Sequence, residues 1–216
     1  MTVHTLHFGD EGQRATRELL QAAERLDPPA PPELRSQLAT LESLDRQYGS
    51  SNPLPLEGVG ELVDALLVEL ARRDALEVIL GVALWAIRHE VPIGVVEPVV
   101  NALAARSNAA RSREELAAVF GLMQGVIAHV APRLGPDLER SNPERPWRLL
   151  HANLAITAIR TEDPALMDFA FDALDRALPD EGAGFYAEAL ALALNPRISP
   201  VVREKLEQRQ RLGPAQ

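Results

Sequence analysis

The chain has 216 residues, of which 46% are hydrophobic and 25% charged, and its formal net charge is −9. This length and composition are typical of a globular protein that buries a real core, in one large domain or two small ones. The diffuse acidity argues against nucleic-acid and polybasic membrane-surface proteins, both of which need clustered Lys and Arg. The absence of cysteine excludes disulfides, thiolate metal sites and a cysteine nucleophile.

Two further features of the composition concern the source and the compartment. Basic charge is almost entirely arginine, since Lys205 is the only lysine, and alanine is abundant. We interpret this pair of biases as the codon habit of a bacterial-type source. No apolar run reaches transmembrane length, and the N-terminus lacks the basic-then-apolar pattern of a signal peptide. We therefore expect a cytoplasmic protein.

Helical periodicity dominates the chain after a short segment, residues 1–9, whose weak alternation predicts an extended arm. The pattern predicts an all-α fold of about ten antiparallel helices joined by short turns. In chain order they are expected near residues 11–26, 33–48, 58–90 with a break at 72–74, 92–106, 112–131, 146–161, 164–178 and 182–194, with a short one from residue 200.

Several helix starts carry recognisable signals. Asp74 is predicted to cap the second half of the 58–90 stretch, and Ser112 opens a capping box. The dipeptide 163–164, Asp-Pro, places a cap before a proline in the first helical turn. Pro92 is expected to start a helix in the same way, and Pro98 then kinks that helix or resets its start.

One short phrase occurs twice in the chain. Residues 86–92 read AIRHEVP and residues 158–164 read AIRTEDP, with five identities in seven positions at a separation of 72 residues. Both copies lie where one helical pattern ends and another begins, so we expect an internal duplication of three helices. The expected layout is a HEAT- or tetratricopeptide-like array or a compact bundle, although 72 residues exceeds the usual period of such repeats. Arg88 and Arg160 recur in the phrase and are predicted to cap their helix C-termini.

The segment 132–145 divides the chain most clearly, because it is the longest irregular stretch and is rich in Pro, Asn, Gly and charge. It separates an N-terminal helical part, residues 10–131, from a C-terminal one, residues 146–212. We expect the two parts to form one continuous domain.

The same segment is the best candidate for an exposed recognition loop. It contains Arg140 and Arg145 and is followed by Trp147, and Arg and Trp are the residues that most often anchor interfaces. A loop of this length without a binding role is the equally weighted alternative.

The helix expected at 164–178 has the most readable surface pattern. Its apolar residues cover most of its circumference. The remaining strip holds three aspartates at positions i, i+4 and i+7: Asp168, Asp172 and Asp175. The functional interpretation is an acidic groove that receives a basic segment of a partner; the alternative is a solvated face tempered by Arg176. In the earlier copy, Glu97 and Asn101 align with the first two aspartates and would extend the strip.

No spacing of catalytic or metal-ligating residues stands out. The chain has no HExxH or ExxH pair, no GxSxG elbow and no phosphate loop. The hypothesis is therefore a non-enzymatic interaction module, an adaptor, assembly factor or regulatory subunit, that binds another protein without cofactor, metal, nucleic acid or membrane. The alternative is a small-molecule-binding protein or enzyme with a pocket between helices, which a pocket around His151, Asn153, Arg160 and Trp147 would favour.

Overall fold

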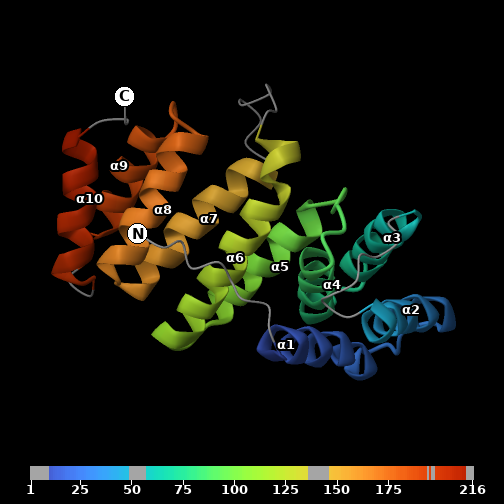
Figure 1. Cartoon of the computed structure of the whole chain (residues 1–216). Coiled ribbons are helices and arrows are strands. Elements are labelled where there is room, and N and C mark those ends of the chain that lie inside the picture. The colour runs from blue at the N-terminus through green and yellow to red at the C-terminus, as the bar shows by residue number, and fades with distance from the viewer. Residues whose placement is uncertain (1–9, 49–56, 136–145, 194, 196–197, 213–216) are drawn as a thin grey trace. The chain divides into compact units, whose positions relative to one another are not determined.

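The computed structural model describes residues 10–48, 57–135, 146–193, 195 and 198–212. This part of the chain contains ten α-helices and one 3-10 helix, and no strand occurs in it (Figure 1). The all-α prediction is confirmed. The elements are α1 (Asp10–Gln21), η1 (Ala22–Arg25), α2 (Pro32–Tyr48), α3 (Val59–Ala71), α4 (Leu76–Arg88), α5 (Glu97–Ala109), α6 (Arg113–Leu134), α7 (Pro146–Thr161), α8 (Pro164–Ala177), α9 (Gly182–Ala193) and α10 (Pro200–Leu212).

The helices belong to two compact units, each with its own core. Unit 1 runs to Arg106 and includes Ala128–Val130, whereas unit 2 comprises Ser107–Ile127 and the residues from Ala131 onward. The division between the units therefore lies within α5 and α6. The expected arm, residues 1–9, lies outside the described residues, and so do residues 136–145 of the irregular segment predicted at 132–145. The start of that segment was wrong, because α6 continues through Pro132 to Leu134.

In unit 1, α4 is the central helix because it is apolar on every side. All nine residues from Val78 to Ala86 are buried, and both α1 and α3 pack against this helix. The indole N–H of Trp85 donates a hydrogen bond to the backbone oxygen of Leu41 in α2 at 3.1 Å. At Gly81 the α1 backbone comes so close that a Cβ would lie 2.9 Å from the nitrogen of Leu20. A helix surrounded by others needs this all-round apolar pattern.

The helix expected from Pro92 begins at Glu97 instead, so that start was wrong. The intervening segment is held by α3, where Asp64 Oδ1 accepts hydrogen bonds from the backbone N–H groups of Gly94 and Val95 at 2.7 and 2.9 Å. The segment also buries three aliphatic side chains: Val91, Ile93 and Val96. The proline after Glu97 then resets the helix start, because a proline in the first turn gives up no helical hydrogen bond.

Both copies of the repeated phrase end a helix in the same backbone geometry. Glu90 has φ 55° and Glu162 has φ 57°, and Asp74 at the end of α3 adopts φ 53°. A left-handed residue after the last turn lets the chain reverse, a role that glycine usually fills. After α4 the N–H of Val91 bonds to the oxygen of Ala86 at 2.9 Å, which is the long hydrogen bond of a Schellman motif. The repeated phrase therefore encodes a helix end.

Two of the predicted helix caps are confirmed, and one was wrong. Ser112 Oγ accepts a hydrogen bond from the backbone N–H of Glu115 at 3.1 Å, and Asp163 Oδ1 accepts one from that of Ala165 at 2.8 Å. Asp74 does not cap α4: the residue at the cap position is the next one along the chain, and it makes no side-chain hydrogen bond. Asp74 instead takes the left-handed position that closes α3.

The two repeated arginines reach across to other helices, so their predicted role as caps of their own helices was wrong. Arg160 Nη1 donates to the backbone oxygen of Ser107 in α5 at 2.6 Å. Arg88 Nη2 lies 3.1 Å from Asp45 Oδ1 in α2, and the Arg88 side chain is only 1% exposed. His89 Nε2 lies 2.8 Å from the same carboxylate oxygen. No side-chain nitrogen of Arg88 has a well-directed hydrogen bond, so Asp45 acts as the counter-charge of the buried guanidinium.

Helix α6 is the one helix in the described residues that is long and apolar enough to cross a membrane by length and composition. This finding corrects the statement that no apolar run reaches that length. The buried side chains of α6 recur every three or four residues: Leu116, Val119, Phe120, Met123, Val126 and Val130. Such one-sided burial is typical of an amphipathic helix that packs on a protein core.

Candidate protein-interaction surface

Helix α8 in unit 2 presents the predicted acidic strip. The Asp163 cap and Pro164 start the helix, and its apolar face is buried through Met167, Ala170, Phe171 and Leu174. The three aspartates differ in exposure: the side chains of Asp168 and Asp172 are 47% and 57% exposed, but that of Asp175 only 2%. The side chains of Asp168 and Asp172 are therefore partly open to solvent, whereas Asp175 belongs to the interior of the unit.

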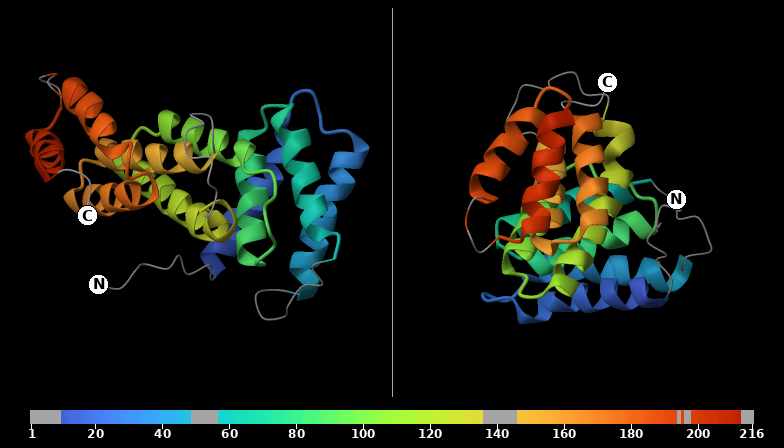
Figure 2. Two further views of the ribbon diagram at one scale, coloured as in Figure 1. Left: turned by 90° about the horizontal axis from the view of Figure 1, so that it is seen from above. Right: turned by 90° about the vertical axis from the view of Figure 1, so that its left-hand side faces the viewer.

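The cations that face this strip come from α10. Helix α10 packs against α8 and α9, and Figures 1 and 2 show it beside α9. Lys205 Nζ lies 2.6 Å from Asp168 Oδ2, and Arg209 pairs with both Asp172 and Asp175. The acidic strip thus receives a basic helical segment of the same chain.

Arg209 is the centre of a partly buried polar network. Its Nη1 lies 3.3 Å from Asp175 Oδ2, and its guanidinium carbon lies 5.9 Å from the centre of the Phe171 ring. Tyr186 in α9 donates its hydroxyl to Asp175 Oδ1 at 2.8 Å. Burial, together with this bond to a carboxylate, raises the pKa of the Tyr186 phenol. Partial burial opposes the charge of Arg209, but its hydrogen bond to Asp172 and the nearby carboxylates outweigh that and raise its pKa.

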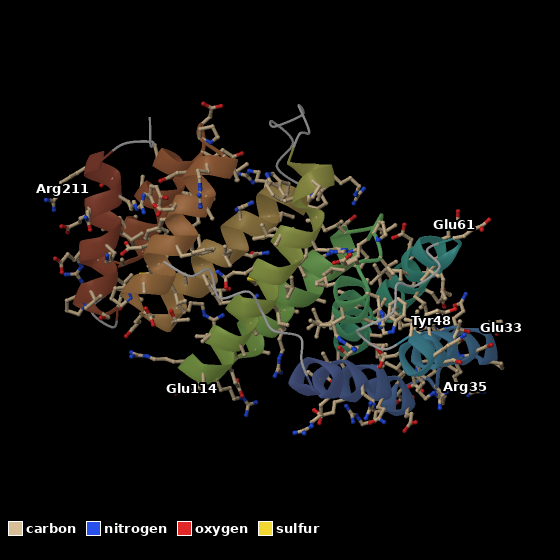
Figure 3. All side chains as sticks on the ribbon, viewed as in Figure 1. Glu33, Arg35, Tyr48, Glu61, Glu114 and Arg211 are labelled. Atoms are coloured by element: carbon tan, nitrogen blue, oxygen red, sulfur yellow. The ribbon has the colours of Figure 1, made fainter. Side chains whose placement is uncertain are left out.

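Apolar contacts accompany the charges on the same face of α10. Val202 and Leu206 are 1% and 0% exposed, and they lie at i and i+4 while the two cations lie at i+3 and i+7. Arg211, labelled in Figure 3, projects from α10 and pairs with Glu207 on the same helix. The docked face of α10 therefore combines two aliphatic anchors with two positive charges.

The sequence pattern predicted the acidic strip but not that α10 packs against it. The expected tempering by Arg176 does not involve a carboxylate, because Arg176 Nε donates to the backbone oxygen of Asp172 at 3.0 Å. The signal that could have found the cover is the spacing of aliphatic and basic residues in α10, which matches the spacing of the aspartates. A local pattern does not say which helix such a face will contact.

The other predicted interface residues lie outside α8 in the sequence. Glu97 and Asn101 are exposed on α5 within unit 1. Arg140 and Arg145 lie outside the described residues. Trp147 is half-buried in the first turn of α7, and its ring lies 4.4 Å, edge-on, from that of His151. His151 therefore packs on Trp147, one helical turn earlier.

His151 is a buried histidine whose ring nitrogens both lack a hydrogen-bond partner. Burial and the nearby positive charge of Arg176 lower its pKa to about 4. The imidazole is therefore neutral near pH 7. A neutral, sequestered ring fits a packing role in the core of unit 2.

Cavities bear on the alternative of a small-molecule site. Unit 1 has an open groove of about 560 Å³ between α2 and α3, and its lining includes Leu34, Asp64 and Val68. A smaller pocket of about 190 Å³ lies among α1, α2 and α4 over Trp85. Neither is lined by the residues that the pocket hypothesis named: His151, Asn153, Arg160 and Trp147.

No protein-family model matches the chain, and comparisons with curated proteins and with solved structures find no similar protein.

Proposed function

We propose that this protein is a non-enzymatic, cytoplasmic interaction module, an adaptor, assembly factor or regulatory subunit, that binds another protein through the acidic face of α8. The observation that carries the proposal is the docking of α10, whose Lys205 and Arg209 pair with that face. A surface that already holds a basic helix by charge and apolar contact has the chemistry to bind a basic segment of a partner.

We further propose that the repeated phrase is the trace of a duplicated unit in a HEAT-like helical array. The support is the shared helix end, since Glu90 and Glu162 have matching left-handed conformations. Each phrase joins two helices, α4 to α5 and α7 to α8. Arrays of this kind commonly provide extended surfaces for binding other proteins.

The test is co-purification from the source cell of the tagged wild type and a variant with Asp168→Arg and Asp172→Arg. Asp175 is left unchanged because it is buried, and reversing its charge would disturb the core. The matched control reverses two other exposed carboxylates of unit 2, Glu188→Arg and Glu204→Arg. Circular dichroism confirms that each variant is folded.

We expect a stoichiometric protein partner with the wild type and the control, and its loss from the strip variant. Retention of that partner by the strip variant would contradict the assignment of this face. The absence of any stoichiometric partner in all three samples would contradict the interaction function itself.

A further inference from the structure

The contacts of α10 define which partner segment the acidic face accepts. We propose that the partner is a cationic amphipathic helix of the α10 type, with aliphatic residues at i and i+4 and cations at i+3 and i+7, and that α10 competes with it for the face. This inference rests on the proposed function, because it names the partner and the regulation of the same site. The four positions correspond to Val202, Lys205, Leu206 and Arg209.

The two aliphatic residues supply the contact area, and the cations set the register. Val202 and Leu206 are almost completely buried, although the rest of α10 is rich in charged and polar residues. Lys205 pairs with Asp168, and Arg209, one helical turn further, pairs with Asp172. Since both helices repeat every three to four residues, cations at this spacing meet carboxylates at the matching spacing on α8. A segment without that spacing would leave a carboxylate unpaired.

Helix α10 contacts both α8 and α9, and Arg203 donates hydrogen bonds to the backbone oxygen of Ala193 in α9, but α10 is short, which makes exchange with a partner helix feasible. Helix α10 has 13 residues, and an isolated helix of that length is marginal in water. Its pairs with Asp168 and Asp172 are partly solvated, since both carboxylates remain about half exposed, and such pairs contribute little each. Arg209 also pairs with the buried Asp175, and a cation at i+7 of the partner helix would take over that pair. Leu206, which is completely buried, is an anchor that can be removed without changing α8.

The experiment uses the full chain and a fluorescent peptide that reproduces residues 198–212. Leu206→Ala in the chain weakens the intramolecular helix, whereas Gln208→Ala, at an exposed position of α10, is the matched control. While α10 is docked, it blocks the acidic face, so the peptide can bind only the fraction of molecules in which α10 has left. We therefore expect the Leu206→Ala chain to bind the peptide at least about tenfold more tightly than wild type. The Gln208→Ala chain should bind it like wild type. Equal affinity of all three chains would overturn the proposal.

A second experiment, which does not depend on Leu206→Ala, exchanges the charges of the Asp168–Lys205 pair. The chain variant Asp168→Lys is compared with wild type against two peptides, the native one and one with Lys205→Glu. We expect the preference to reverse, so that Asp168→Lys binds the Lys205→Glu peptide more tightly than the native peptide. An unchanged preference would show that the peptide does not adopt the register of α10, which contradicts the proposal.

The peptide assay contains no cellular partner, so its failure is distinguishable from failure of the proposed function. If a partner is lost in the Asp168→Arg, Asp172→Arg variant but the peptide does not bind, the interaction function stands and the α10-type helix is the wrong ligand. If the peptide binds as expected but no partner co-purifies, the face accepts such a helix and the proposed cellular role is wrong.

Discussion

Glu90 and Glu162, 72 residues apart in the chain, hold the same left-handed backbone conformation, with φ of 55° and 57°. The match explains why the phrase around them is repeated: both copies reverse the chain after a helix. Neither position is a glycine, so each helix end carries the strain of a side chain in a region that favours glycine.

Replacing Glu90 by glycine should therefore stabilise the protein. Glu90 is exposed, so little packing is lost with its side chain. We expect Glu90→Gly to raise the free energy of unfolding by about 0.5 kcal/mol, after the greater flexibility of the unfolded glycine chain is allowed for. Glu90→Ala is the control, because it removes the same side chain and keeps the strain. Denaturant titration should place the glycine variant above the alanine variant; the opposite order would contradict the strain.

Gly81 should respond to alanine in the opposite direction from an ordinary helical glycine. A Cβ at Gly81 would lie 2.9 Å from a backbone nitrogen of α1, whereas one at Gly184 in α9 would meet nothing within 4 Å. We expect Gly81→Ala to lower the free energy of unfolding by about 1–3 kcal/mol because a backbone contact must shift. Gly184→Ala should raise it by up to about 1 kcal/mol through helix propensity. Two stabilising substitutions would show that α1 does not pack on α4 this closely.

The lowered pKa of His151 should make the protein less stable in mild acid. Its pKa is lowered to about 4 in the folded protein, against about 6.5 in an unfolded chain, so the folded state binds fewer protons. As the pH falls from 7 toward 4, His151 binds a proton in the unfolded state but stays largely neutral in the folded state, so folding becomes less favourable. The loss approaches about 3 kcal/mol over that interval.

The measurement is denaturant unfolding at pH 7 and pH 4.5 for wild type and His151→Leu. The variant should show the smaller difference between the two pH values, because the other titrating groups are common to both chains. It should also be more stable than wild type at pH 7, since two unsatisfied ring nitrogens are removed. An identical pH dependence in the two chains would mean that His151 is not the group responsible.

Asp45 should be essential to unit 1 because it is the counter-charge of the buried Arg88. Asp45→Asn keeps the size of the side chain but leaves the guanidinium uncompensated, and we expect it to lower the free energy of unfolding by about 3 kcal/mol. The cost should fall sharply when Arg88→Met is introduced together with it, because the buried charge is then gone. Additive effects of the two substitutions in chemical denaturation would contradict the pairing.

Much of the helical layout could be predicted, because local signals mark it. The start of α8 follows from Asp163-Pro164, and the capping box at Ser112 marks α6. The start of α5 could not be predicted, since the groups that hold residues 92–96 out of a helix belong to Asp64, about 30 residues earlier.

The candidate site, too, could be predicted only in part. Helical periodicity places Asp168, Asp172 and Asp175 on one strip, because it depends only on neighbouring residues. It does not show that Asp175 is buried or that the strip faces α10, since these depend on Tyr186 in α9 and on Lys205 and Arg209 in α10, which lie on other helices. Charge alone therefore overestimates how much of the strip is open to a partner.

The two hydrogen bonds from Asp64 to Gly94 and Val95 have a consequence for limited proteolysis. A protease must draw several residues of its substrate into an extended, fully accessible conformation, and a segment between helices is the usual place for this. Residues 91–96 join α4 to α5 but are fixed by Asp64 and by the buried side chains of Val91, Ile93 and Val96. We expect a broad-specificity protease to leave this connection intact in the native protein, and to cleave it once Asp64→Ala has released it.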